Sequence, residues 1–286
     1  MKILFVGGVH GDEKTGINLC KLEGCTYENN YIKKIIHGIE CGFLIANPMA
    51  CSKNVHFIDH NLNDCFGSVG KGYEYSLQAE LCKKYGRYSD DFADIVVDFH
   101  TTNADTNLLM FPALDVNHHL LTTAYDLGIT PYYCPNDFKG NYCDQYLGRS
   151  GITIELSCLS NQENLQALKL LSKYVLRLIK NIDKSDSNRI IKGLTYAKDV
   201  SYPKNKSGYS LFPDCIVTCK TNKIYKNEVL LINPLTGDIF KRSDDDYTAL
   251  FMNCPSYYEF GQAMTLAKDA SFKIEGDHSL IKIEQA

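Results

Sequence analysis

The sequence has no apolar run long enough to cross a membrane. No segment approaches the roughly 20 apolar residues that a membrane-spanning helix needs. The apolar start of the chain, Ile3 to Val6, is also too short for the core of a signal peptide, which takes roughly 7 to 15 residues. We therefore expect a protein without a membrane segment that is cytoplasmic.

Positive charge is sparse and scattered along the chain. The 286 residues include 30 lysines and arginines against 34 acids, which gives a formal net charge of −4, and only five residues are arginines. No basic run is present, although nucleic-acid-binding surfaces carry one. The composition therefore predicts no nucleic-acid partner. Internal repeats and low-complexity tracts are absent as well.

Cysteine is plentiful, with twelve residues, but its spacing fits neither a disulfide framework nor a zinc ribbon. A chain without a secretory signal normally keeps its thiols reduced, and Cys215 with Cys219 lacks a matching second pair. The adjacent His118 and His119 point in different directions on regular backbone and have no further ligands nearby in the sequence. We assign no metal site to these four residues.

Apolar runs alternate with segments of helical periodicity. A helix is predicted over residues 161–182, where apolar residues recur on one face, and the segment 75–85 could be helical as well. The predicted strands are Ile3–Val6, Gly42–Ala46, Ile95–Phe99, Asn107–Phe111 and Ile152–Leu156. This alternation predicts an α/β fold with a mixed central sheet flanked by helices. A hydrophobic content of 44% over this length is sufficient to build a large core.

The polar, aperiodic segment 183–188 predicts a domain boundary. After it the chain becomes strand-like and rich in turns, for example at 228–233 and the following turn at 234–238. We expect a catalytic domain over residues 1–184. A smaller β-rich domain over 185–286 would contribute to the site.

Two polar clusters follow the ends of predicted strands. Gly7-Gly8-Val9-His10-Gly11-Asp12-Glu13 comes after the first strand, and His100 ends the strand that begins at Ile95. Strand ends that meet at one sheet edge are where α/β proteins keep their sites, so His10, Glu13 and His100 can come together. Two histidines and one carboxylate are a common ligand set for catalytic zinc, with a fourth position left open. The alternative for each histidine alone is a hydrogen-bonded loop residue.

These motifs resemble those of the aspartoacylase and succinylglutamate desuccinylase family, which belongs to the zinc carboxypeptidase-like hydrolases. The resemblance is carried by GGVHGDEKTG (7–16), NP (47–48), FIDHNLNDCFG (57–67), VDFHTTN (97–103), GITIE (151–155) and PSYYE (255–259). It implies one zinc ion per chain, held by His10, Glu13 and His100. It also implies that Glu155 is the general base and Tyr257 a late active-site tyrosine.

The activity that the resemblance implies is zinc-dependent removal of an acyl group from a small N-acyl amino acid or related amine. Glu155 would take the proton of the attacking water and pass it to the leaving amine. A carboxylate at the end of an apolar strand is otherwise costly, although it could instead be a rim acid paired with a lysine. Asp98 faces the same side of its strand as His100 and could orient that ring or cap a loop.

The departures from the family pattern concern the substrate. Where the family has an arginine and an Asn-Arg pair that binds a carboxylate, this chain has His56 and Asn63-Asp64. Neither histidine nor aspartate replaces the planar fork of arginine, so N-acetylaspartate itself is not the expected substrate. We expect Asn63 and Asp64 to bind the substrate, with Asp64 facing an ammonium or another donor, and His56 to polarise the carbonyl. Asp64 could instead point to solvent or pair with a lysine.

Two more residues are candidates through the resemblance. Arg149 lies six residues before Glu155, much as a family arginine that binds a second carboxylate does, although it could also be a surface residue. Tyr257 would donate a hydrogen bond to the substrate or close the site from the second domain.

Two other functions stay open at this stage. The chain could be a zinc carboxypeptidase-like peptidase that acts on a small peptide or peptidoglycan fragment, because the chemistry is identical. It could also be a non-catalytic descendant that binds a ligand or partner. Assembly into a homo-oligomer is left open.

Overall fold

The computed structural model describes residues 1–102, 107–114, 116–135, 143–157, 161–182, 189–204, 216–217, 222–252, 261–275 and 280–285. Seven helices are found in these ranges: α1 (Lys14–Leu22), α2 (Pro48–Lys53), α3 (Leu62–Cys65), α4 (Tyr73–Tyr85), α5 (His118–Asp126), α6 (Cys143–Leu147) and α7 (Asn161–Asn181). The strands are β1 (Lys2–Gly7), β2 (Tyr31–Ile36), β3 (Ile39–Ile45), β4 (Ala93–Thr102), β5 (Leu108–Phe111), β6 (Thr130–Tyr133), β7 (Gly148–Ser157), β8 (Ile190–Ser201), β9 (Ile216–Val217), β10 (Lys223–Ile224), β11 (Val229–Ile232), β12 (Ile239–Arg242), β13 (Tyr247–Leu250), β14 (Gln262–Glu275) and β15 (Leu280–Gln285).

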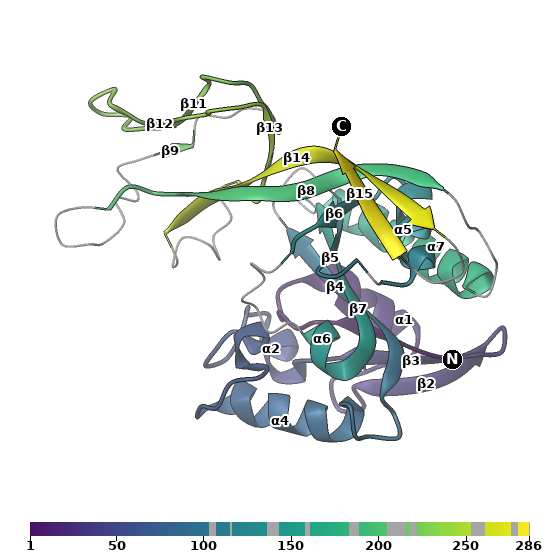
Figure 1. Cartoon of the computed structure of the whole chain (residues 1–286). Coiled ribbons are helices and arrows are strands. Elements are labelled where there is room, and N and C mark those ends of the chain that lie inside the picture. The colour runs from purple at the N-terminus through teal and green to yellow at the C-terminus, as the bar shows by residue number, and fades with distance from the viewer. Residues whose placement is uncertain are drawn as a thin grey trace.

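Most strands form one mixed sheet, in the order β10-β13-β14-β8-β6-β5-β7-β4-β1-β3-β2, and β15 pairs with β14 (Figure 1). Strands β3, β1, β4 and β7 run parallel to one another, whereas β2, β5 and β14 add antiparallel pairs. A second, three-stranded sheet has the order β12-β11-β9. The α/β class with a mixed central sheet is confirmed.

Alternate side chains of the parallel strands enter two separate cores, because successive residues of a strand face opposite sides. Ile3 and Phe5 of β1 pack with α1, α5 and α7, whereas Leu4 and Val6 pack with α3, α4 and α6. Burial on both faces is the reason why these strands are continuous apolar runs in the sequence. Val96 of β4 lies on the α6 side, so Asp98 and His100, two and four residues later, face that side too.

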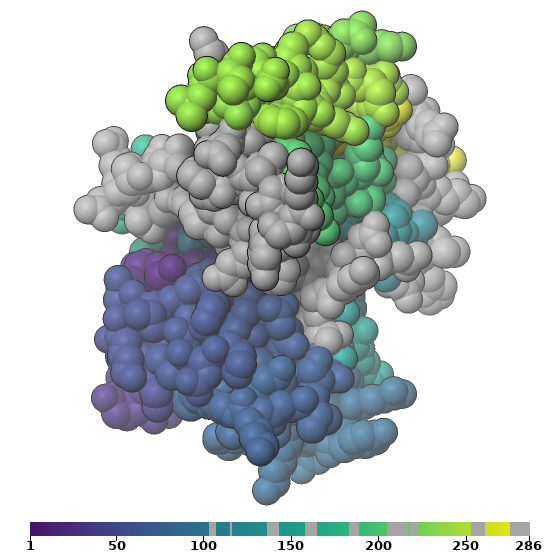
Figure 2. Space-filling view, turned by 90° about the vertical axis from the view of Figure 1, so that its left-hand side faces the viewer, coloured from purple at the N-terminus to yellow at the C-terminus, as the bar shows by residue number. Residues whose placement is uncertain are grey.

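The predicted boundary at residues 184/185 lies outside the described ranges, so the division into two domains stays a prediction. Beyond it the chain is β-rich, as expected. Strand β8 joins the main sheet between β6 and β14, and the strands after β8 gather at the opposite end of the molecule from α2 and α4 (Figures 1 and 2). Among the described helices, none is long and apolar enough to span a membrane.

Candidate active site

The loop after β1 is shaped by glycines that allow close backbone packing. Gly8 has a φ of +70°, and a Cβ there would lie 2.6 Å from the Sγ of Cys51. A Cβ on Gly11 would lie 2.2 Å from the backbone of Ala50, so only glycine fits. The amide of Gly11 donates to the carbonyl of His56 at 3.1 Å. The loop that carries His10 is thereby held against the segment that carries His56.

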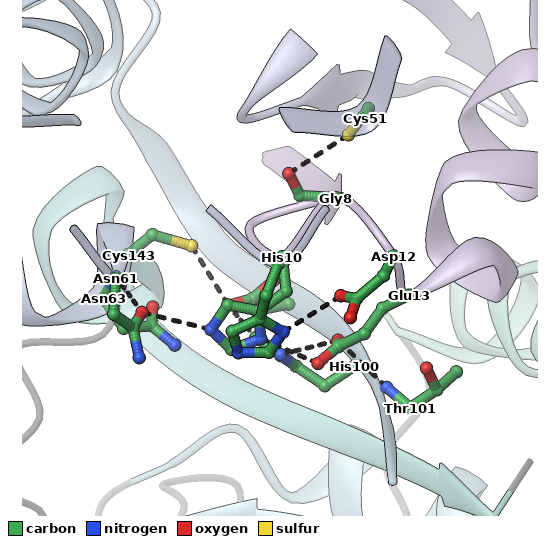
Figure 3. Close-up of polar contacts among 12 residues, drawn as sticks. Gly8, His10, Asp12, Glu13, Cys51, Asn61, Asn63, His100, Thr101 and Cys143 are labelled. Carbon is green, nitrogen blue, oxygen red and sulfur yellow. Dashed lines mark hydrogen bonds and ion pairs between the residues drawn. The ribbon is translucent and has the colours of Figure 1, made fainter. Parts of the chain in front are cut away.

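His10, Glu13 and His100 converge on one point (Figure 3). The Nδ1 of His10 lies 2.7 Å from one oxygen of Glu13, and the Nδ1 of His100 lies 3.0 Å from the other. The second oxygen of Glu13 also accepts a hydrogen bond from the amide of Thr101 at 3.1 Å. Three ligand atoms within 4.8 Å of one another make a group that can hold a metal ion.

The far nitrogens of both imidazoles contact acceptor oxygens. The Nε2 of His10 lies 3.1 Å from Asn61 Oδ1, and the Nε2 of His100 lies 2.9 Å from Asp98 Oδ2. Such contacts place the proton on Nε2 and leave Nδ1 free as a ligand, the arrangement typical of metal-binding histidines. The donor set of two imidazoles and one carboxylate therefore fits zinc.

The charges at this cluster stabilise one another. Burial raises the pKa of Glu13, but the charges of His10 and His100 outweigh this and hold the pKa well below its usual value. For His100, burial lowers the pKa, but Asp98 and Glu13 together raise it well above its ordinary value, so a metal ion that binds here displaces a proton from Nδ1. The cluster therefore keeps Glu13 ionised, as a metal ligand must be.

Glu155 lies on β7 directly beside His100 of β4, its partner in the parallel register. Burial raises the pKa of Glu155 to about 7, and the charge of His100 opposes this rise. A carboxyl with such a pKa can both accept and release a proton near neutral pH, as a general base and acid requires.

His56 stacks on His10, with ring centroids 3.8 Å apart and an angle of 18° between the planes. Its Nδ1 lies 2.9 Å from Asp12 Oδ1, so Asp12 accepts the Nδ1 proton. The Nε2 atom is buried and has no hydrogen-bond partner in the ranges that the structure describes. A buried polar atom without a partner is costly, so Nε2 is suited to meet a group of a bound ligand.

Asn61 and Asn63 lie next to His10 at the start of α3 (Figure 3). Asn61 is the N-cap, and its Oδ1 accepts the amide of Asn63 at 3.0 Å. Asn63 is buried, and its Oδ1 finds no hydrogen-bond partner in the described part of the chain. Asp64 is exposed on the same helix. Desolvation raises the pKa of Asp64, while the charge of His10 opposes the rise.

The segment between His56 and Asn61 is held by the buried carboxylate of Glu74 on α4. This carboxylate accepts hydrogen bonds from the amides of Ile58 (2.7 Å), Asp59 (3.0 Å) and His60 (3.2 Å). It also accepts one from Asn47 Nδ2 at 3.1 Å. A single buried acid thus fixes the path of the loop that supplies His56 and Asn61.

The structure does not bring Arg149 to this cluster. Arg149 lies near the start of β7, its side chain is 74% exposed, and its Nε is 3.7 Å from Asp94 Oδ1. Six residues of strand separate it from Glu155, or about 20 Å at about 3.3 Å per residue. This placement does not support a role in anion binding at the site. Tyr257 lies outside the described residues.

Four residues at the site were not singled out from the sequence. Asp12 contacts His56, Asn61 contacts His10, Glu74 holds the loop, and Cys143 donates its thiol to Asp98 at 3.1 Å. Only Asp12 and Asn61 had a signal, because both lie inside the motifs that carry the resemblance. The proposed orienting role of Asp98 agrees with its contact to His100.

The sequence and the fold are both similar to those of known acylases and desuccinylases. The model of the succinylglutamate desuccinylase/aspartoacylase catalytic domain matches residues 1–182. A probable aspartoacylase from Trichodesmium erythraeum is 26% identical over 96% of this chain and 98% of its own. An N-acyl-aromatic-L-amino acid amidohydrolase (carboxylate-forming) from Xenopus laevis is 27% identical over 54% of each chain. The crystal structure of murine aminoacylase 3 superimposes with a TM-score of 0.78 at 17% identity, covering 99% and 98% of the two chains.

Proposed function

The chain belongs to the succinylglutamate desuccinylase/aspartoacylase family, and on that basis we propose that it is a zinc-dependent amidohydrolase that removes the acyl group from a small N-acyl amino acid or related amine. The observation that carries the proposal is the convergence of His10, Glu13 and His100, with both far imidazole nitrogens in contact with acceptor oxygens. Whole-length similarity to a probable aspartoacylase supports it.

In this proposal His10, Glu13 and His100 hold one zinc ion. When bound, zinc supplies Lewis-acid chemistry, because it polarises a carbonyl and lowers the pKa of water to about 7. Glu155, next to His100 in the sheet, accepts the proton of the attacking water. The same carboxyl then gives the proton to the nitrogen of the leaving amine, so that the amine departs neutral.

His56 is proposed to polarise the substrate carbonyl through Nε2. In this role Nε2 faces the carbonyl oxygen, and the carboxylate of Asp12 at Nδ1 fixes the orientation of the ring. The single positioned donor takes the place of the arginine that the family pattern has there. Preorganised donors of this kind act mainly on the transition state.

Asn63 and Asp64 are proposed to bind the amine half of the substrate. The free Oδ1 of buried Asn63 can accept an N–H, and Asp64 repels a carboxylate but attracts an ammonium. N-acetylaspartate is therefore not the proposed substrate. Tyr257 and the region after residue 184 are proposed to complete the site, and the protein is proposed to act in the cytoplasm.

The test is hydrolysis of a panel of N-acylated acidic, neutral and basic amino acids and short peptides by the zinc-loaded protein, followed by mass spectrometry. We expect cleavage of neutral or cationic N-acyl compounds, and Glu155→Ala should abolish it. Preferential cleavage of short peptides would favour the peptidase alternative. A zinc-loaded protein that cleaves no member of the panel would contradict the proposed deacylase.

A further inference from the structure

A buried thiol lies beneath the proposed zinc site. Cys143 is the first residue of α6, which packs on β4 and β7, and it is fully buried. Its Sγ donates to Asp98 Oδ2 at 3.1 Å, and the same oxygen accepts a hydrogen bond from His100 Nε2 at 2.9 Å. Thiol, carboxylate and imidazole thus form one continuous hydrogen-bonded chain, and Figure 3 shows Cys143 and His100 at its two ends.

Asp98 has few other contacts that could fix its orientation. Its carboxylate is fully buried, and Oδ1 has no hydrogen-bond partner among the described residues. Of its hydrogen bonds found in the structure, one comes from His100, the ring to be oriented. The other comes from Cys143. Within the described part of the chain, the thiol is therefore the contact that can hold the carboxylate independently of the ring.

We propose that Cys143 is a positioning residue of the zinc site: its thiol holds Asp98 against His100 Nε2, and so keeps His100 Nδ1 directed at the point where it meets Glu13. This inference rests on the proposed zinc site. Outer contacts of this kind fix the tautomer and the orientation of a metal-binding imidazole.

The chemistry of the thiol agrees with the role of a neutral donor. Burial, followed by the charge of Asp98, raises the pKa of the Cys143 thiol well above its ordinary value. The thiol therefore stays protonated and donates its S–H. Cys143 is not among the described residues that converge on the metal position, which are His10, Glu13 and His100. It consequently acts through Asp98 rather than as a ligand.

The experiment compares Cys143→Ala with Cys143→Ser in the full-length protein. Both changes remove similar volume, but serine keeps a hydrogen-bond donor and alanine does not. The matched control is Cys20→Ala, because Cys20 is also fully buried and donates its thiol to a carbonyl, that of Leu44 at 3.4 Å. The readouts are the zinc dissociation constant, from competition with a chromophoric chelator, and the melting temperature of the zinc-free protein.

We expect Cys143→Ala to weaken zinc binding roughly 10-fold, the lower end of what outer contacts contribute. Cys143→Ser should stay within roughly 3-fold of the wild type, and Cys20→Ala should leave zinc binding unchanged. In an Asp98→Ala background the additional change Cys143→Ala should have no effect, since the proposed action runs through Asp98.

Equal zinc affinity in the wild type and Cys143→Ala would overturn the inference and leave the proposed function intact. The inference would also be overturned if Cys143→Ala and Cys143→Ser weakened zinc binding equally, or if Cys20→Ala weakened it as much as Cys143→Ala. Either result would indicate a general loss of packing. A thiolate-to-metal charge-transfer band in the cobalt-substituted protein that disappears in Cys143→Ala would show direct ligation instead. A wild type that binds no zinc would overturn both the inference and the proposed function.

Discussion

Glu155 combines a position next to a proposed metal ligand with a carboxyl whose pKa burial raises to about 7. We predict that Glu155→Gln lowers kcat by a factor of roughly 10² to 10⁴, the usual contribution of a general acid–base group. KM should change little, because glutamine keeps the shape of the side chain. Steady-state kinetics on a cleaved substrate measures both, and zinc content serves as the control. Full activity of Glu155→Gln would exclude this residue as the base.

Asp12 is predicted to support catalysis through its contact with His56. Asp12→Ala removes the acceptor at Nδ1, so the ring loses its orientation and we expect kcat to fall roughly 10-fold. His56→Ala should cost more, roughly 10² to 10³, as the loss of one positioned donor does. Asp12→Asn keeps an acceptor oxygen and should lie between the wild type and Asp12→Ala. A fall in zinc content in Asp12→Ala would assign Asp12 to metal binding instead.

The proposed metal ligands could be found from the sequence because each lies in a compact motif at a strand end. Asn61 and Cys143 have contacts that span 51 and 45 residues, respectively. No local pattern predicts such pairs, since only the packing of α3 and α6 against the sheet brings them together. Arg149 illustrates the opposite situation. Its nearness to Glu155 in sequence becomes separation in space, because both lie on one extended strand.

At the level of elements, the strands that carry the site follow from their apolar runs, and helix α7 follows from its periodicity. Helix α4 was expected only as a segment that could be helical. The short strand β6 and the edge strand β2 were not predicted. Residues 31–36 of β2 include two exposed lysines, and β6 contains Pro131 within only four residues. Pairing with β3, and with β5 and β8, makes these segments strands, and sequence patterns alone contain no information on such pairing.

Glu74 connects α4 to the loop that supplies His56 and Asn61. We predict that Glu74→Gln destabilises the protein by about 1–3 kcal/mol, because a buried carboxylate that accepts several N–H bonds would be replaced by an amide whose NH2 group faces donors. Burial raises the pKa of Glu74, but the backbone hydrogen bonds outweigh it and lower the pKa. Urea unfolding measures the loss, with the exposed Glu80→Gln on the same helix as the control. Equal stability of the two variants would contradict the anchoring role.

Asp126 connects three elements. Its carboxylate, at the end of α5, pairs with Arg177 of α7 at 2.8 Å and with Arg189 just before β8. The hydrogen bond from Arg189, together with the charges of both arginines, lowers the pKa of Asp126. We predict that Asp126→Asn costs about 1 kcal/mol at pH 7, since the group is partly exposed.

The stabilisation that the ion pairs of Asp126 provide depends on pH. The folded-state pKa of Asp126 lies below the unfolded value of about 3.9, so its contribution is present above that pH and is lost as the pH falls through the folded value. The difference in unfolding free energy between the wild type and Asp126→Asn should therefore shrink below about pH 4. A constant difference from pH 7 to pH 3 would contradict the assignment.

For the whole molecule, the proposed metal joins segments that are distant in sequence. His10 and Glu13 follow β1, His100 lies in β4, and His56 with Asn61 packs on His10. A ligand that binds only the folded state stabilises it according to its concentration relative to its dissociation constant, by about 2.7 kcal/mol at 100-fold excess. A native state with zinc bound should therefore unfold at a higher temperature than the apo protein.

We predict that chelation of zinc lowers the melting temperature by about 5–10 °C, because 1 kcal/mol corresponds to about 2–4 °C in a protein approaching this size. Differential scanning calorimetry with and without a chelator measures the shift. His100→Ala should show no such shift, since removal of one of the three proposed ligands abolishes tight zinc binding. The exposed His37→Ala should keep it, because His37 lies in the turn between β2 and β3, away from these ligands. An equal shift in His100→Ala and the wild type would place the metal elsewhere in the chain.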